Sequence, residues 1–209
     1  MTLSKPRTLS ALIEDLQTHT TGEGVSVKTL LNEFHERGFG FFLFLIALPA
    51  ALPIPAIGLN TIIALPLLIL TAQQAIGRQT VWIPKKWHDK TIPSEKIESF
   101  INAANPWIKR LEHLTRPRLS FITQGAFSYI IGISGFIMSL AVAIPLPLTN
   151  TVPAFGIAVM AIGVLMRDGL AVIGGMLVGL AWTFALLSFV VIFGSEGFDL
   201  MKEFIKGLF

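Results

Sequence analysis

The chain has 209 residues, of which 53% are hydrophobic and 14% are charged, and its mean hydropathy is +0.69. Soluble domains carry about 25% charged residues, so the composition predicts an integral membrane protein. The chain has no cysteine, which excludes disulfides, thiolate catalysis and cysteine metal sites. Its four histidines have no second ligand at metal spacing, and we expect neither a metal nor another cofactor.

Charge divides the chain into two apolar tracts and a basic centre. Residues 38–77 contain no charge, and residues 119–195 contain only Arg167 and Asp168. A spanning helix needs about 20 apolar residues, so each tract exceeds one span. Residues 78–118 hold nine basic and four acidic residues, a net charge of +5. The positive-inside rule places this loop in the cytoplasm, where anionic lipid headgroups are a nearer partner than nucleic acid.

The first part of the chain predicts surface helices followed by a broken membrane segment. Residues 1–37 form an N-terminal segment with apolar residues at helical spacing, which we expect at the membrane surface or against the protein body. In the first tract, residues 38–52 and 61–76 are each long enough for about 23 Å of helix, short of the roughly 30 Å hydrocarbon core. They therefore predict two half-length helices that meet at a break.

The basic loop, residues 78–118, mixes tryptophan with lysine and arginine, as is typical of the headgroup layer. A helix is expected after Pro93, and Asn105-Pro106 reads as the start of the next one. Packing of this helix pair on its own protein is an equal alternative to lipid contact. The residues predicted to meet headgroups are Trp82, Lys85, Lys86, Trp87, Trp107, Lys109 and Arg110.

The second tract, residues 119–195, predicts long helices with faces of small residues. A helix over about 119–144 carries small residues at spacings of three and four, namely Gly125, Ser128, Gly132, Gly135, Ser139 and Ala143. A helix over about 169–193 repeats this with Ala171, Gly175, Gly179 and Thr183. Such faces allow close helix approach in lipid, either within the chain or at a dimer seam, and we expect a homodimer. Residues 196–209 predict an amphipathic tail.

The prolines of the first tract belong to an internal repeat. Pro53-x-Pro55 matches Pro145-x-Pro147, and Asn60-Thr61 matches Asn150-Thr151, after which Pro153 follows. Proline interrupts a helix because it lacks the backbone donor and clashes with the preceding turn. The predicted fold is therefore an all-α membrane protein with a repeat of Pro-broken or re-entrant segments, an organisation common in transporters.

Two groups of polar residues in the apolar tracts are site candidates. Asn60, Thr61, Asn150 and Thr151 lie at the breaks, where they either cap the second half-helices or mark converging helix N-termini that offer positive dipole ends to an anion or headgroup. The second apolar stretches of the two repeats, residues 61–76 and 152–166, end in the polar residues Gln73, Gln74, Arg167 and Asp168. These four are either interfacial turn residues or intramembrane polar groups with a function.

Several of these motifs together resemble the ExoD family of bacterial membrane proteins. They lie in "LPIPAIGLNTIIALPLLILTAQQAIGRQTVWIPKKW" and "IPLPLTNTVPAFGIAVMAIGVLMRDG", and the resemblance covers roughly residues 38–195. It implies a multi-pass protein of the bacterial inner membrane that is associated with exopolysaccharide production and with tolerance of alkaline conditions. It supplies no catalytic residues.

Three functional hypotheses follow. The first is a small transporter or flippase-like accessory, whose site is at the paired breaks. The second is a scaffold that binds anionic lipid or polysaccharide-assembly proteins through the basic loop. The third, a membrane transferase, is disfavoured because Asp168 is the only acid in the apolar tracts. If the first tract is re-entrant, the N-terminus and the loop are cytoplasmic and the C-terminus is outside.

Overall fold

The computed structural model describes residues 24–26, 38–51, 59–87, 90–95, 117–144 and 150–206. Its α-helices are α3 (Gly38–Ala51), α4 (Leu59–Ala75), α6 (Phe127–Ala143), α7 (Thr151–Met166) and α8 (Gly169–Lys206). Short elements are the 3₁₀ turns η2 (Lys85–Trp87) and η3 (Ser120–Thr123), and the two-residue strands β1 (Val25–Ser26) and β2 (Thr91–Ile92), which pair antiparallel. The predicted helical fold is confirmed.

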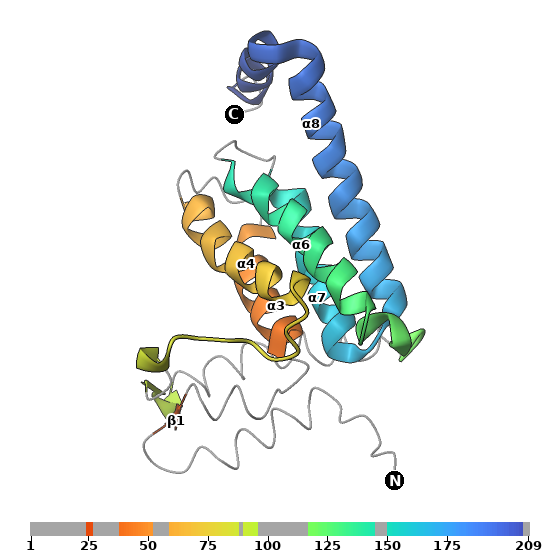
Figure 1. Ribbon diagram of the computed structural model, residues 1–209. Helices are drawn as coiled ribbons and strands as arrows, with labels where there is room; N and C mark the ends of the chain where they lie inside the picture. Colours follow the sequence, from red (N-terminus) through yellow and green to blue (C-terminus); the bar gives the residue numbers. More distant parts are fainter. Residues whose placement is uncertain are drawn as a thin grey trace.

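Helices α3, α4, α6 and α7 form a bundle, and α8 runs along one side of it and extends beyond it (Figure 1). The starts of α3 and α6 and the ends of α4 and α7 lie at the same end of the bundle, where their residues line one cavity. Each pair, α3 with α4 and α6 with α7, therefore runs antiparallel. The segments at this end include residues 76–95 (Figure 1).

The pairs are packed against each other through glycines. A Cβ atom on Gly40 of α3 would lie 2.8 Å from the Ala161 carbonyl oxygen and 2.9 Å from the Leu165 nitrogen of α7. A Cβ atom on Gly132 of α6 would lie 2.6 Å from the Ala75 Cα of α4. Because only glycine allows such backbone approach, α3 packs on α7 and α6 packs on α4 at near contact.

Helix α8 is the longest element, and it contains a break in helical geometry at Gly194 (φ 55°, ψ −137°). This break divides the predicted membrane helix from the predicted amphipathic tail. Its stretch Gly169–Gly194, with a mean hydropathy of 2.4, is the one helix among the described residues that is long and apolar enough to cross a membrane. The apolar helices of the bundle are shorter, at 14 to 17 residues.

The boundaries follow the sequence prediction closely in three of the four bundle helices. The expected helix over 119–144 differs, because it begins with η3 and a turn at Gly125 (φ 59°) before α6 starts at Phe127. The breaks themselves, residues 52–58 and 145–149, lie outside the described residues and include Pro53, Pro55, Pro145 and Pro147. Pro153 is buried in the first turn of α7.

Both small-residue faces are used inside the chain. Gly132 and Gly135 of α6 face α4, where a Cβ atom on Gly135 would lie 2.8 Å from the Thr71 Cγ2. Gly175 of α8 faces α7, where a Cβ atom would lie 2.6 Å from the Gly156 carbonyl oxygen and from the Met160 nitrogen. A homodimer stays a prediction, and these contacts assign both faces to packing within one chain.

Adjacent glycines of α8 provide a test of this packing. We expect Gly175→Ala to lower the free energy of unfolding by about 1–3 kcal/mol, because its methyl group overlaps the α7 backbone. Gly174 has nothing within 4 Å of an added Cβ atom, so Gly174→Ala should leave stability unchanged or raise it by up to about 1 kcal/mol. Thermal unfolding of the purified variants measures both. Equal effects of the two substitutions would contradict the assigned contact.

Candidate functional site

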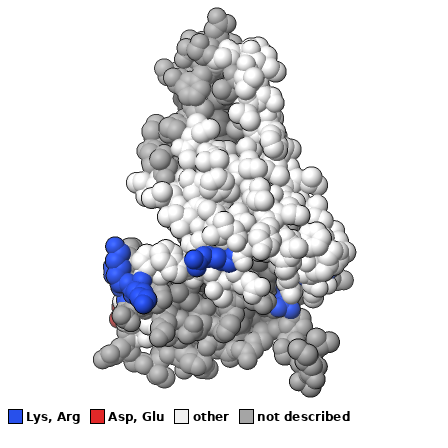
Figure 2. All heavy atoms as spheres, viewed as in Figure 1, with Lys and Arg blue, Asp and Glu red and all other residues white. Residues whose placement is uncertain are grey.

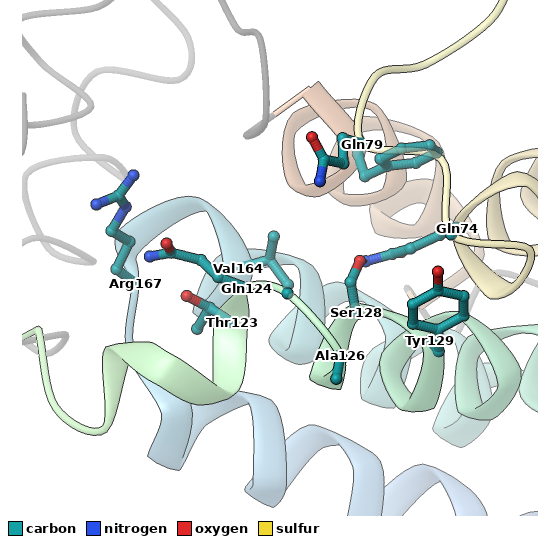
Figure 3. Close-up of a pocket in the computed structure, with 12 residues that line it drawn as sticks. Gln74, Gln79, Thr123, Gln124, Ala126, Ser128, Tyr129, Val164 and Arg167 are labelled. Atoms are coloured by element: carbon teal, nitrogen blue, oxygen red, sulfur yellow. The ribbon is translucent and has the colours of Figure 1, made fainter.

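A cavity of about 380 Å³ opens at the end of the bundle where the two helix pairs meet. Three helix ends and the η3–α6 turn surround it (Figure 3). Its lining is mostly polar and contains one charged side chain. The lining residues are Phe39, Gln74, Gly77, Gln79, Thr123, Gln124, Gly125, Ala126, Ser128, Tyr129, Val164 and Arg167.

The two helices that end at the cavity stop in the same way. At the end of α4, Gly77 is left-handed (φ 83°), and the Gly77 and Arg78 nitrogens donate to the Gln74 and Gln73 carbonyl oxygens at 3.0 and 3.1 Å. At the end of α7, Arg167 is left-handed (φ 56°), and its nitrogen and that of Asp168 donate to the Val164 and Gly163 carbonyl oxygens at 3.4 and 2.8 Å. Both ends are Schellman caps, in which the left-handed residue is usually glycine.

Gln74 is the most deeply placed polar residue of the cavity. Its side chain is only 2% exposed, and its Nε2 donates to the Ser128 Oγ of α6 at 3.3 Å. Its Oε1 has no hydrogen-bond partner among the described residues. A buried amide oxygen without a donor costs about 1–3 kcal/mol, so Gln74 is an energetically unfavourable residue to keep beside the cavity unless it has a role there.

The neighbouring residue Gln73 has a different, structural role. Its Oε1 accepts from the Trp82 nitrogen at 2.7 Å, and its Nε2 donates to the Trp82 carbonyl oxygen at 3.1 Å. Both polar groups of the side chain are thus satisfied by one backbone unit of the following segment. Gln73 anchors residues 81–83 to α4, whereas Gln74 faces the cavity.

Arg167 and Asp168 also have different roles. One Asp168 carboxylate oxygen accepts from the Leu170 and Ala171 nitrogens at 3.0 and 3.3 Å, which caps the N-terminus of α8. Arg167 is half-buried, and it lies with Thr123 and Gln124 on the opposite side of the cavity from Gln74 and Ser128 (Figure 3). Of the predicted polar residues at the ends of the two repeats, Gln74 and Arg167 line the cavity together.

Of the predicted asparagine–threonine pairs, Asn150-Thr151 is not among the residues that line this cavity. Asn60 and Thr61 lie in the first turn of α4, which begins at Leu59, and their side chains are outside the described residues. Asn150 precedes α7, and Thr151 is its first residue. The Asn150 side chain makes no capping hydrogen bond, and its buried Nδ2 lacks a partner among the described residues. The capping role expected for Asn150 is therefore wrong.

Basic side chains surround the same end of the molecule (Figure 2). Lys85 and Lys86 of η2 are exposed, and the Arg78 guanidinium lies 5.9 Å from the ring centroid of Trp82. The side chains of Trp87, Trp107, Lys109 and Arg110 lie outside the described residues. Where the structure describes it, the predicted headgroup loop is thus next to the cavity-bearing end of the bundle.

Sequence reasoning missed most of the lining. Gln79, Thr123, Gln124 and Tyr129 are single polar residues in turns or at a helix start, with no spacing that sets them apart. Ser128 was assigned only to a small-residue face. The sequence does contain one indication of the cavity, because Gln74 is a polar residue in an apolar helix shortly before Gly77. A buried amide near such a chain reversal needs a hydrogen-bond partner.

The neighbouring glutamines yield a matched test. Gln73→Leu should lower the free energy of unfolding by about 2–4 kcal/mol, because it removes two hydrogen bonds and leaves the Trp82 backbone unpaired. Gln74→Leu should change it by less than about 1 kcal/mol, since it removes one long hydrogen bond and one unpaired acceptor. Chemical unfolding followed by tryptophan fluorescence compares them, and the reverse order of effects would contradict the two roles.

Comparison with known proteins identifies a family for this chain. The family model described as "Exopolysaccharide synthesis, ExoD" matches residues 9–188. An uncharacterized protein of Synechocystis sp. is 33% identical over 88% of this chain and 89% of its own length. Protein ExoD of Rhizobium meliloti is 27% identical over 91% of this chain and 82% of its own length. No solved structure matches. The chain belongs to the ExoD family, as its sequence motifs predicted.

Proposed function

We propose that the chain is a membrane-embedded protein of exopolysaccharide synthesis that binds and moves a polar substrate through the cavity between its two helix pairs. The carrying observation is the largely polar cavity of about 380 Å³, lined in part by the buried Gln74, whose Oε1 has no hydrogen-bond partner among the described residues. The family model supports the process.

The distribution of polarity supports a lipid environment. Large aliphatic side chains point outward from the bundle, as with Ile62 and Ile76, each 70% exposed. Hydroxyls point inward, where Thr71 and Ser139 are buried and donate to the carbonyl oxygens four residues before them at 2.7 Å. This reverses the arrangement of a soluble bundle, and it fits helices whose outer surface meets hydrocarbon while small and polar residues mediate packing.

The packing also supports an internal repeat. The contact of Gly40 with Leu165 has a counterpart in the contact of Gly132 with Ala75. Gly40 and Gly132 have matching places before the two breaks, and Ala75 and Leu165 have matching places after them. The two halves are thus related by an approximate two-fold axis along the bundle, with both pairs open at the basic end, which is a parallel repeat.

The short helices favour re-entrant pairs. Bundle helices of 14 to 17 residues reach about 21–26 Å, less than the roughly 30 Å hydrocarbon core. The apolar part of α8 has 26 residues, which is long enough to cross. In this proposal both pairs enter and leave on the cytoplasmic side, where positive charge gathers. The inner membrane is crossed once, by α8.

Transport is proposed because the cavity is held between two related halves, at the mouth of the bundle and next to the basic loop. Repeats of this kind place substrate groups at the interface of the halves, where rocking of one half against the other changes access. Chemistry on the substrate is not proposed, because the described residues that line the cavity include neither a carboxylate nor a histidine.

A scaffold role is the second candidate. It is favoured by the exposed Lys85 and Lys86 and by Trp82, which is 54% exposed. Aromatic and basic residues at one level are suited to anionic headgroups. In this version the loop recruits lipid or polysaccharide-assembly proteins, and the cavity residues are not required.

Reconstitution separates the two proposals. Liposomes with the purified protein should move a lipid-linked oligosaccharide between leaflets faster than empty liposomes, and Gln74→Leu should reduce the excess rate at least tenfold. Lys85→Gln with Lys86→Gln should reduce it less than threefold. A rate equal to that of empty liposomes would refute transport. Loss of exopolysaccharide in cells with the lysine variant, but not with Gln74→Leu, would favour the scaffold.

Accessibility labelling tests the topology, because the chain has no native cysteine. Cysteines introduced at Lys90 and Arg118 should react with impermeant reagents from the cytoplasmic side alone. A cysteine at Lys206 should react from the opposite side alone. Ile144→Cys, at the end of α6, should react from neither side, since a re-entrant pair ends inside the bilayer. Labelling of residue 144 from the outer face would show that the pairs span the membrane.

A further inference from the structure

The side of the cavity formed by the end of α7 carries a positive charge. Arg167 is the one charged side chain among the described residues that line the cavity, and it is half-buried there. We propose that this side of the cavity binds a phosphate group through the Arg167 guanidinium. The inference rests on the proposed function, because it names the polar group that the cavity takes. It requires no contact with the buried Gln74, which lies on the opposite side (Figure 3).

The neighbouring carboxylate does not neutralise Arg167. The Asp168 Oδ1 accepts from the Leu170 and Ala171 nitrogens at the start of α8, at 3.0 and 3.3 Å. The other acidic side chain that the structure describes is Glu95, which is exposed in the segment after β2. Within the described part of the chain, Arg167 is ion-paired with neither. A half-buried guanidinium without an acid beside it is stabilised by an anion that enters the cavity.

The backbone of Arg167 supports a role for its side chain. Arg167 is left-handed (φ 56°), a conformation that is unfavourable for residues other than glycine. The equivalent cap at the end of α4 uses Gly77 and avoids this cost. Strain held at such a position is characteristic of functional sites. At the end of α7 the chain thus keeps a guanidinium where glycine would form the cap more easily.

The charges around the cavity favour an anion in it. Basic side chains gather at this end of the molecule (Figure 2). The described side chains include only the acids Glu95 and Asp168, against the six basic residues Arg78, Lys85, Lys86, Lys90, Arg118 and Arg167. A cleft surrounded by one sign of charge raises the local concentration of counter-ions. In the proposed function this end faces the cytoplasmic leaflet, where lipid phosphates lie.

The side chains next to Arg167 favour phosphate over a carboxylate. Both anions match the planar donors of a guanidinium, but a phosphate has further oxygens that can accept from another donor. Gln124 lies on the same side of the cavity as Arg167 (Figure 3), and its amide makes no hydrogen bond among the described residues. Thr123 is already engaged, since its Oγ1 donates to the Ser120 carbonyl oxygen at 2.7 Å. The volume of about 380 Å³ leaves room for a group attached to the phosphate.

Phosphate is offered by two sources, a soluble phosphate and the headgroup of a lipid. Calorimetric titration of the full chain in an uncharged detergent uses inorganic phosphate, acetate and dihexanoyl phosphatidic acid as probes at one ionic strength. We expect inorganic phosphate to bind at least about tenfold more tightly than acetate. Tighter binding of the phosphatidic acid than of inorganic phosphate would identify the lipid as the source. Equal or weaker binding would identify the soluble form.

Two arginines form a matched pair for this test. Arg167→Gly should weaken binding of both phosphate probes at least about tenfold and leave the melting temperature unchanged or raised, because it removes the left-handed strain. The Arg118 carbonyl oxygen accepts from the Gly169 nitrogen at 2.6 Å, so this exposed arginine lies near the same turn, but it does not line the cavity. Arg118→Gln should therefore leave binding within about twofold.

The outcomes separate this inference from the proposed function. Equal losses in the two arginine variants would overturn the site, since they would show attraction by the surface charge alone. Acetate that binds as tightly as phosphate would overturn the ligand class. No binding of any probe by a protein that still moves lipid-linked oligosaccharide would overturn the inference and leave transport standing. Phosphate binding that depends on Arg167 without transport would support the site and refute transport.

Discussion

The contact of α6 with α4 at Gly132 is the constraint on which the cavity depends. Because residue 132 has no side chain, the α6 backbone reaches the Gln74 and Ala75 backbone of α4. One turn earlier in α6, Ser128 then comes within hydrogen-bond distance of the Gln74 amide. A larger residue at 132 would separate the helices and open this polar contact. Gly132 therefore determines both the close packing of α6 on α4 and the position of the Gln74 side chain.

The contact of α3 with α7 at Gly40 resembles that of α6 with α4 at Gly132, although different side chains follow at the two helix ends. In one contact α3 packs on α7, and in the other α6 packs on α4. Beyond that contact, each second helix ends in a cap with the same hydrogen bonds. Packing constrains the backbone of the caps and leaves their side chains free to diverge. The amide of Gln74 and the guanidinium of Arg167 occupy positions that the fold itself does not require to be polar.

The helices were predictable from the sequence because their ends coincide with strong local signals. Charge-free runs, prolines and small-residue spacing bounded α3, α4 and α7 to within about two residues, the ordinary uncertainty of helix ends. The η3 turn before α6 was not predictable, since "LSFITQG" contains no charge and no proline, and Gly125 continues the small-residue spacing of the helix that follows it. Gly125 allows the reversal there, with a positive φ that a helical reading of the same sequence ignores.

The site was predictable only in part, for a geometric reason. Gln73 and Gln74 are adjacent, so they point about 100° apart on a helix, and the sequence does not say which one faces the bundle. The left-handed conformation of Arg167 was equally hidden, because glycine is the usual signal for such a cap. The cavity also needs the ends of α3, α4, α6 and α7 at one level, a tertiary property that no local pattern records.

The different roles of the neighbouring Gln73 and Gln74 connect the cavity to the basic loop. Gln73 holds the Trp82 backbone by two hydrogen bonds, and Trp82 is in turn covered by Arg78. Gln74 follows Gln73 directly in α4, so a displacement of the loop that breaks the Trp82 contact would act on the last turn of the helix that carries the site. The Trp82 segment and the cavity lining are therefore joined through the last turn of α4. In the proposed function, lipid contact at the loop and ligand contact at Gln74 would both need the end of α4 in place.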